Sequence, residues 1–418
     1  MELGRLGILP FFWLGGSVVF LWALRIGGAL AATVSTFLFT TLPPVLAHAG
    51  LMTTDMAAAA CIGAAALASL YWAERPTAKR SIVFGFFLAL AVLAKFSALV
   101  FLPAAWMLMY AASFLERPHG WGKSSIGATG IVLGTAAVLV WAGYLFTFHR
   151  VEYLNLNLPA PALFTGLRSM WVRNQETGWA YLLGERSREG FWYFFPVVLA
   201  VKTPLALLLL TGLAGWSAIR FRACVRILLP LAFSLGILAI AMASKINIGS
   251  RHVLPVYVGV CVASGIAAAH VLTVSGIKRR FAVIGLLAWQ LASGLRHHPD
   301  YLAYANEFAG GHPETVFADS DLDWGQDMKR LGARLQAAGA TEVTMNLFNR
   351  SYLLAGHPFP KVKEMPESAQ PPAGWSAISL THWKLNAVPA WVAHIPPHEV
   401  VGRSIYLYYF PSKAARPE

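Results

Sequence analysis

Apolar runs, each about as long as a membrane-spanning helix, alternate with short polar stretches over residues 1–295. A helix rises about 1.5 Å per residue, so about 20 apolar residues cross the ~30 Å hydrocarbon core of a bilayer. The pattern therefore predicts an α-helical polytopic membrane protein with about ten spans. These are Leu6–Leu24, Ile26–Leu46, Met56–Ala73, Ser81–Ala94, Ala98–Phe114, Ile126–Phe148, Phe194–Ala214, Ile227–Ala243, Leu254–Ile277 and Phe281–Leu295.

Residues 296–418 have a different, more polar pattern and contain most of the Asp and Glu residues of the chain. The periodicity predicts an amphipathic helix at Lys329–Ala337 and a proline-rich loop from His357 to Gly374. Short strands are expected at Thr341–Leu347, Ser376–Leu380 and Ser404–Tyr409. We therefore predict two domains, a multi-span domain over residues 1–295 and a small α/β domain over residues 296–418.

The composition excludes most other classes of protein. Of the 418 residues, 57% are hydrophobic and only 13% are charged, and the mean hydropathy is +0.55. Soluble globular proteins contain about 25% charged residues. A soluble enzyme, a disordered chain and a fibrous repeat are therefore excluded. The 3 cysteines form neither a disulfide framework nor a CxxC metal motif.

The net charge of +13 is distributed unevenly between alternate loops. The short loops of one set contain only Lys95, Lys245 and Arg251, whereas the other set is strongly basic. By the positive-inside rule the basic set is cytoplasmic, so the N-terminus, residues 149–190 and the C-terminal domain are expected on the outer face. The charge is thus attributed to topology and anionic lipid rather than to nucleic acid. The basic set comprises Arg25, Arg75, Lys79, Arg80, Arg117, Lys123, Arg220, Arg222, Arg226, Lys278, Arg279 and Arg280.

Ionisable side chains at the predicted outer ends of the spans are the first candidates for function, because charges in the hydrocarbon are costly. His48 and Asp55 occur in PPVLAHAGLMTTDM, where a proline pair breaks the second span. An ordinary helix N-cap explains Asp55 equally well. Lys95 follows an apolar run of only roughly 21 Å, so its turn is expected below the membrane surface and lining a cavity. Snorkelling to the headgroups is the alternative for Lys95.

A second group of cations lies near the same predicted surface. Lys202 is about eight residues, or roughly 12 Å, inside its span. Lys245, Arg251 and His252 crowd the short segment SKINIGSRHVLP, against the topology rule. Lipid headgroups are one partner for these cations, and a bound phosphate is the other, because arginine presents a planar fork to phosphate oxygens. One carboxylate with several cations suits a lipid-phosphate substrate.

The predicted outer domain contains a third polar run, DSDLDWGQDMKRL. Its aspartates, residues 319, 321, 323 and 327, are spaced like oxygen ligands of a cation. Trp324 and Arg330 occupy the positions where a calcium loop of the EF-hand type needs Gly and Glu. Capping of the following helix by an aspartate, with Trp324 in the core, is the interpretation that the spacing favours. A divalent cation is left open and no other cofactor is predicted.

These motifs, together with AVLAKFSALVFLP, AVKTPLALLLL and HPDYLAYANEFAGG, resemble stretches of the bacterial membrane glycosyltransferases of glycosyltransferase family 39. This family includes protein O-mannosyltransferases and lipid A aminoarabinose transferases. The resemblance implies a GT-C fold in the bacterial inner membrane. It also implies a polyprenyl-phosphate sugar donor, an acceptor (protein, lipid or glycan) on the outer face, and inverting transfer with a carboxylate base.

The resemblance assigns a role to each candidate residue. Asp55 matches an acidic position in an outer loop and is the predicted catalytic carboxylate, with His48 near the substrate. The predicted ligands of the donor phosphate are Lys95, Lys202, Lys245, Arg251 and His252.

The chain departs from the family at its N-terminal end. The first outer loop of the family, with its Asp-Glu pair, has no counterpart here, so the resemblance predicts a chain that lacks its first span. Two alternatives to an active enzyme therefore stay open. They are a transporter or flippase for lipid-linked sugars, and an inactive, truncated membrane partner.

Overall fold

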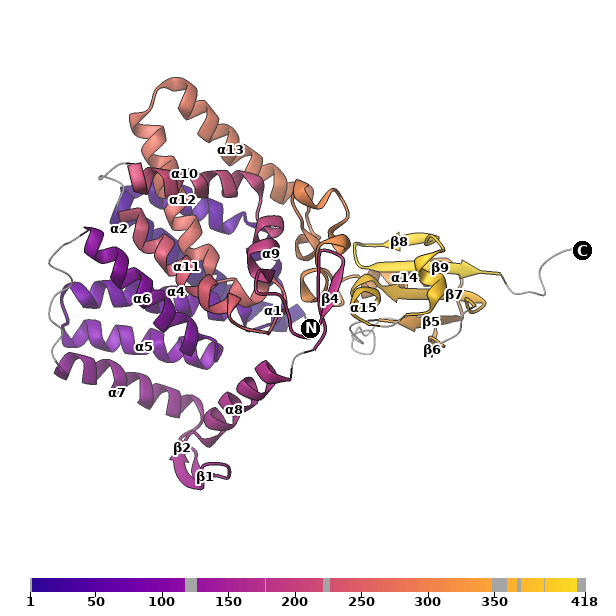
Figure 1. Cartoon of the computed structure of the whole chain (residues 1–418), viewed down its shortest axis with the longest axis horizontal. Helices are drawn as coiled ribbons and strands as arrows, with labels where there is room; N and C mark the ends of the chain where they lie inside the picture. Colours follow the sequence, from indigo (N-terminus) through magenta and orange to yellow (C-terminus); the bar gives the residue numbers. More distant parts are fainter. Residues whose placement is uncertain are drawn as a thin grey trace, which may run out of the picture.

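The computed structural model of the chain consists of a large helical part and a smaller part that contains a β-sheet (Figure 1). The sheet lies at one end of the helices. The structure describes residues 2–116, 126–176, 178–220, 226–347, 359–366, 370–386 and 388–411.

The first long helix, α2 (Leu9–Thr40), is broken and folds back on itself at Gly28. Gly28 has φ 77°, which is in the region that favours glycine. The two limbs lie side by side, because a Cβ atom placed on Gly16 would lie 3.8 Å from Cγ2 of Thr40. The first two predicted spans therefore exist as two limbs, but the turn is at Gly28 rather than at Arg25.

The remaining helices of the helical part follow the predicted apolar runs closely. Consecutive helices run in opposite directions, so the start of one helix lies beside the end of the next. The connecting loops therefore gather at two opposite ends of the helical part. They are α1 (Glu2–Leu6), α3 (Pro43–Ala49), α4 (Asp55–Glu74), α5 (Ala78–Ala94), α6 (Ala98–Glu116), α7 (Ile126–Gly143), α9 (Phe194–Lys202), α10 (Leu205–Arg220), α11 (Leu228–Met242), α12 (Val256–Val274) and α13 (Ile277–Arg296).

The length and composition of the helices indicate which of them can span a membrane. Within the described ranges, four helices are long and apolar enough to cross a membrane: Gly4–Thr40, α4, α7 and α12. A fifth span results if α9 and α10, which are bent by 116° relative to each other, count as one span. The other predicted spans correspond to helices that are shorter or less apolar, such as α11 with 15 residues. The expectation of about ten spans is therefore not confirmed.

The segment between α7 and α9 contains elements that the sequence did not predict. It forms a hairpin and a helix at the edge of the helical part, and then a second, smaller hairpin between the helices and the sheet (Figure 1). These elements are β1 (Phe148–Val151), β2 (Leu156–Pro159), α8 (Pro161–Gln175), β3 (Ala180–Leu182) and β4 (Glu185–Ser187).

The part of the chain after α13 is called the outer part, because it lies beyond one end of the helices (Figure 1). It begins with a series of single 3-10 turns and then forms a five-stranded sheet. The turns are Tyr301–Ala303, Glu307–Ala309, Pro313–Thr315 and Asp319–Asp321. The strand order is β6-β5-β7-β9-β8, with β5 parallel to β6 and β7, and β9 antiparallel to β7 and β8. The strands are β5 (Glu342–Asn346), β6 (Lys361–Glu364), β7 (Gly374–Ser379), β8 (Glu399–Val401) and β9 (Ile405–Phe410). Two helices, α14 (Met328–Ala337) and α15 (Leu380–Leu385), and a 3-10 turn at Ala390–Ala393 complete this part.

Both faces of the sheet are covered, and strand β9 shows why. Side chains alternate between the two faces of a strand. Ile405 and Leu407 pack with Leu331 of α14 on one face. Tyr408 packs with Trp391 on the other face. The small α/β domain is thus confirmed as a fold, with one core under α14 and an aromatic core opposite.

The predicted elements of this part are mostly confirmed. Helix α14 and strands β5, β7 and β9 lie within two residues of their predicted positions. Strand β8 was not predicted, and the expected loop from His357 to Gly374 is wrong where β6 pairs with β5. Residues 357, 358 and 367–369 of that loop lie outside the described residues.

The predicted boundary between the two domains, at residues 295 and 296, falls at the end of α13. The main apolar core nevertheless continues beyond it, because Phe317 and Leu322 belong to the same cluster as Val201 of α9. Residues 297–322 thus pack with the helices, and the sheet has its own core. The division into two domains stays a prediction.

Close packing of α2 against α12 yields a first testable prediction. A Cβ atom on Gly265 would lie 2.0 Å from Oγ and 2.6 Å from Cα of Ser35. Gly265→Ala should therefore force the helices apart and cost about 1–3 kcal/mol. The thermal unfolding midpoint in detergent, followed by circular dichroism, should fall.

Gly134→Ala is the matched control, because no atom lies within 4 Å of the added Cβ on α7. This variant should unfold at the temperature of the wild type or slightly above. Equal midpoints for the two variants would contradict the assigned helix contact.

Candidate functional site

The centre of the candidate site is an ion pair between Asp55 and Lys95. Asp55 is the first residue of α4, and Lys95 directly follows α5. Because these helices are consecutive, similar in length and joined by a short turn, the start of α4 lies beside the end of α5. Lys95 Nζ donates to Asp55 Oδ1 at 2.6 Å, and the Asp55 side chain is only 3% exposed. The structure thus brings together two of the predicted site residues.

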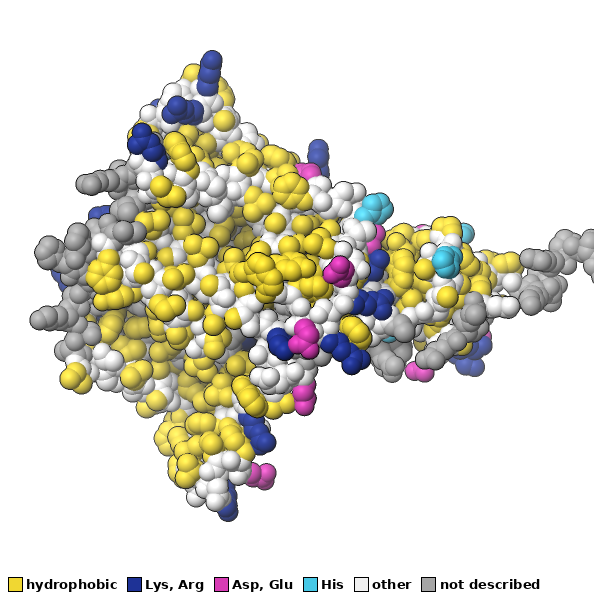
Figure 2. Space-filling view, viewed as in Figure 1, with side chains coloured by type: hydrophobic (Ala, Val, Ile, Leu, Met, Phe, Trp, Pro, Cys, Tyr) yellow, Lys and Arg dark blue, Asp and Glu magenta, His cyan; other side chains and the backbone are white. Residues whose placement is uncertain are grey.

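The opposite end of the same helices has a different charge arrangement. Arg25 pairs with Glu74 and lies 4.3 Å from the centre of the Tyr71 ring, while Arg80 donates to the Tyr71 carbonyl. Figure 2 shows basic side chains at the end of the helices away from the sheet, and a mixture of acidic, basic and histidine side chains towards the sheet. The Asp55–Lys95 pair therefore lies at the end of the helices that faces the outer part.

Arg251 is a second cation of this site, in the 3-10 turn Ser250–Val253. Its Nε donates to the Ile248 carbonyl at 3.2 Å, and its guanidinium lies 4.4 Å from the centre of the Trp324 ring. No carboxylate pairs with its terminal amino groups among the residues that the structure describes. The guanidinium is thus held in place with its fork available to an anion.

Several buried polar atoms near these charges lack a hydrogen-bond partner within the described ranges. They are Nδ1 of His48, Oγ1 of Thr53, Oγ of Ser97 and Nδ1 of His252. Buried polar groups are nearly always paired in folded proteins, so an unpaired group needs an explanation. All four residues lie within seven positions of Asp55, Lys95 or Arg251 in the sequence. They are suited to bind a polar ligand.

Both histidines are neutral at physiological pH. Burial lowers the pKa of His48 to about 4, although the Asp55 charge acts in the opposite direction. Burial also lowers the pKa of His252 to about 3, and the Lys95 charge adds to this effect. The His252 ring packs against Phe101 and Phe195. Each histidine can therefore offer one hydrogen bond without adding charge.

Two predicted cations have partners elsewhere. Lys202 is fully buried, and its Nζ donates to the carbonyls of Leu302 at 2.5 Å and Asp321 at 3.0 Å. Lys245 pairs with Glu189 at 2.7 Å, and both side chains are exposed. The ammonium of Lys202 thus binds the outer segment to α9, and that of Lys245 forms a surface ion pair.

Each of three aspartates in the DSDLDWGQD run accepts a hydrogen bond from a distant serine. Asp321 accepts from the backbone N–H and the hydroxyl of Ser250, at 2.7 and 2.6 Å. Asp323 accepts from the Ser379 hydroxyl at 2.5 Å and Asp327 from the Ser404 hydroxyl at 2.9 Å. The predicted capping role is wrong, because Asp327 is at the N-cap of α14 without a side-chain cap bond.

A metal site is not formed by the residues that the structure describes. No three His, Cys, Asp or Glu side chains in those ranges converge as metal ligands. The aspartates instead bind serines, and Trp324 lies partly exposed under Arg251 rather than in the core.

Asp319 is a further acidic group close to Arg251. Its backbone has φ 69°, a left-handed conformation in which an aspartate is tolerated, and its Oδ1 accepts the Ser320 N–H at 2.6 Å. Burial raises the pKa of Asp319 to about 6, although the Arg251 charge lowers it. This carboxyl therefore changes its charge near neutral pH.

Sequence reasoning missed several residues that shape this site. Trp324 and Ser250 received no role, because their partners are far away in the sequence, and Asp319 and Asp321 were considered only as cation ligands or as a helix cap. The recurring aspartates were the only signal, and their spacing suggested cation ligands or a cap rather than serine partners.

Comparison with known proteins bears on the fold. No family model and no curated protein sequence matches the chain. Its structure is similar to that of ArnT from Cupriavidus metallidurans bound to undecaprenyl phosphate, with 14% identity and a TM-score of 0.50 over 99% of this chain and 85% of that chain. An oligosaccharyltransferase from Archaeoglobus fulgidus, tethered with an acceptor peptide, gives 12% identity and a TM-score of 0.49 over 87% and 53% of the two chains.

The similarity to ArnT confirms the GT-C fold that the family resemblance implied. The chain is an integral membrane protein of this fold, with a small sheet-containing part at one end of its helices.

The contact between Asp321 and Ser250 yields a second prediction. Ser250→Ala removes a buried hydroxyl donor to a buried carboxylate, which should lower the free energy of unfolding by about 1–3 kcal/mol. Urea unfolding in detergent, followed by tryptophan fluorescence, measures this change.

Ser169→Ala is the control, because the Ser169 hydroxyl is exposed and donates to the Thr165 carbonyl of its own helix. Its free energy of unfolding should stay within about 0.5 kcal/mol of the wild type. An equal loss in both variants would show that Asp321 does not depend on Ser250.

Proposed function

We propose that the protein is a membrane glycosyltransferase that transfers a sugar from a polyprenyl-phosphate donor to an acceptor. The observation that carries the proposal is the position of Lys95 and Arg251 at one end of the helices, beside a buried carboxylate and unpaired polar atoms. The similarity in fold to ArnT, solved with undecaprenyl phosphate, supports the same class of donor.

Lys95 and Arg251 are the proposed ligands of the donor phosphate. Arg251 has its fork free of carboxylates among the described residues, and arginine binds phosphate oxygens in a bidentate manner. Lys95 adds a compact charge that Asp55 holds in place. The Nδ1 atoms of His48 and His252 supply further polar contacts to the donor.

The proposed reaction needs one base and one stabilised leaving group. The acceptor nucleophile forms a bond to C1 of the sugar and loses its proton to the Asp55 carboxylate. The bond between C1 and the phosphate oxygen breaks, and both electrons leave with the polyprenyl phosphate. Lys95 and Arg251 stabilise the negative charge of this leaving group.

Lys202 and Lys245 are left out of the proposed phosphate site. The Lys202 ammonium is occupied by two carbonyls, and Lys245 faces Glu189 at the surface. Their proposed roles are to hold the outer segment and to form a surface ion pair.

The proposed location is the bacterial inner membrane, with the site and the sheet on the outer face. The uneven distribution of Lys and Arg between alternate loops supports this orientation. The acceptor is therefore a protein, lipid or glycan that is presented outside the cytoplasm.

The third prediction concerns activity. Arg251→Ala should lower transfer of labelled sugar from a polyprenyl-phosphate donor by about 100-fold or more, because one fixed donor to the leaving group is lost. Asp55→Asn should have an effect of similar size, because the base is lost. The measurement is product formation in membranes that contain equal amounts of each variant.

Lys278→Ala is the matched control for charge, because Lys278 lies at the opposite end of α12 from Arg251. It should retain wild-type transfer. Full activity of Arg251→Ala and Asp55→Asn would refute the assigned site, whereas binding without transfer in the wild type would favour a transporter or an inactive partner.

The fourth prediction concerns pH. The pKa of Asp319 is about 6, so this group becomes negatively charged between pH 5 and pH 7. The negative charge of an ionised Asp319 weakens the attraction between Arg251 and a phosphate. Affinity for undecaprenyl phosphate should therefore fall roughly three- to tenfold over this range because of Asp319.

Binding titrations at both pH values, with Asp319→Asn alongside, measure this effect. The ligand itself titrates equally in both experiments, so only the difference between the two proteins counts. A raised pKa also means that Asp319 stabilises the fold at low pH and that this contribution is lost as the pH rises through 6. An identical pH dependence in wild type and Asp319→Asn would contradict the prediction.

A further inference from the structure

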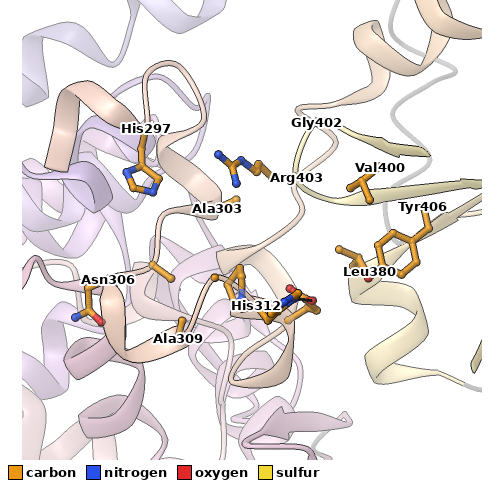
Figure 3. Close-up of a pocket in the computed structure, with 14 residues that line it drawn as sticks. His297, Ala303, Asn306, Ala309, His312, Leu380, Val400, Gly402, Arg403 and Tyr406 are labelled. Atoms are coloured by element: carbon orange, nitrogen blue, oxygen red, sulfur yellow. Dashed lines mark hydrogen bonds and ion pairs between the residues drawn. The ribbon is translucent and has the colours of Figure 1, made fainter. Parts of the chain in front are cut away.

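A cavity of about 350 Å³, separate from the candidate site, lies between the turns that follow α13 and the hairpin β8–β9. Figure 3 shows its lining, with His297 and His312 on the side of the turns and Arg403 and Tyr406 on the side of the sheet. None of the predicted site residues lines it. Its volume is at the lower end of the range for small-ligand sites.

Arg403 is the main cation of this cavity. Its side chain extends into the cavity towards the segment that contains Ala303 and His297 (Figure 3). No carboxylate or carbonyl pairs with its guanidinium in the part of the chain that the structure describes. An unpaired guanidinium directed into a partly enclosed cavity favours an anionic ligand.

The turn that carries Arg403 is fixed by a buried carboxylate. Asp327 Oδ2 accepts the backbone N–H of Arg403 at 2.9 Å and that of Ser404 at 3.1 Å. Gly402 has φ 62°, and a Cβ there would lie 2.0 Å from Asp327 Oδ1. The position of Arg403 is thus set before any ligand binds.

Two exposed apolar side chains occur close in sequence to residues that line the cavity. His297 directly follows α13, the last predicted span. Leu295 of this helix is 65% exposed, and Phe308, next to the cavity residue Ala309, is 67% exposed. A ligand with an anionic head and an apolar chain fits a cation beside such a surface.

The acid at the far side of the cavity does not compete for Arg403. Glu314 Oε1 lies 3.2 Å from Nδ1 of His312. The charge of Glu314 also acts on Lys384 and on Tyr406. Among the residues that the structure describes, Arg403 therefore has no acidic partner of its own.

We propose that this cavity binds the phosphate head group of an anionic membrane lipid, separately from the donor site. The phosphate binds Arg403 and His297, and the acyl chains lie along Leu295 and Phe308. The bound lipid thereby connects the helical part to the sheet.

The probe is phosphatidylglycerol, added to full-length protein in phosphatidylcholine nanodiscs. It should raise the thermal unfolding midpoint, because a ligand of the native state stabilises it. Arg403→Gln should need roughly tenfold more phosphatidylglycerol for the same rise, since a charge-assisted hydrogen bond is lost. Lys361→Gln, which removes a charge from the exposed strand β6, should behave as the wild type.

Further arms separate the possible explanations. In the Arg251→Ala protein, phosphatidylglycerol should still cause the part of the rise in unfolding midpoint that Arg403→Gln removes. Failure of the donor site and failure of this site are therefore distinguishable. An equal response of Arg403→Gln and wild type would overturn the proposal. An equal, Arg403-dependent rise with inorganic phosphate in pure phosphatidylcholine would overturn the lipid assignment in favour of a soluble anion.

Discussion

The hydrogen bonds between buried aspartates and distant serines hold the outer part of the protein to its helices. Asp321 fixes the turn that carries Arg251, and Asp327 fixes the hairpin that carries Arg403. A buried carboxylate without partners is strongly unfavourable, so each aspartate requires its donors to stay in place. Because these aspartates belong to one short run, the two turns keep a fixed relation to each other.

Lys202 strengthens the same junction from the side of the helices. Its ammonium is buried at the end of α9, where only polar or aromatic partners can offset the loss of water. The carbonyls of Leu302 and Asp321 supply two hydrogen bonds, and the Phe317 ring lies 5.0 Å away. In the sequence Lys202 resembles a substrate ligand, but in the structure its ammonium binds the segment after α13 to α9.

Local patterns account for most of the fold, whereas long-range contacts account for what was missed. Helix α14 and strand β9 follow from periodicity, because α14 covers one core and the side chains of β9 alternate between two cores. The pair of Asp55 and Lys95 was foreseeable as well, since consecutive helices place both residues at one end. Strand β6 was missed because its short, charged sequence forms a strand only by pairing with β5.

The same limit applies to the site. Arg251 stood out as a basic residue in a loop where few are expected, but nothing local indicated Trp324 beneath it. The two are more than seventy positions apart and meet only because Asp321 fixes Ser250. Long-range hydrogen bonds of this kind leave no periodic trace in the sequence.

The charges of the candidate site explain why it is suited to a singly charged anion. Asp55 is negative, Lys95 and Arg251 are positive, and the nearby histidines are neutral, so these groups carry one net positive charge while Asp319 is protonated. An uncompensated charge is costly in a poorly solvated site. Trp324 holds the guanidinium plane and leaves its edge free, so a phosphate that enters can neutralise the site without breaking the Asp55–Lys95 pair.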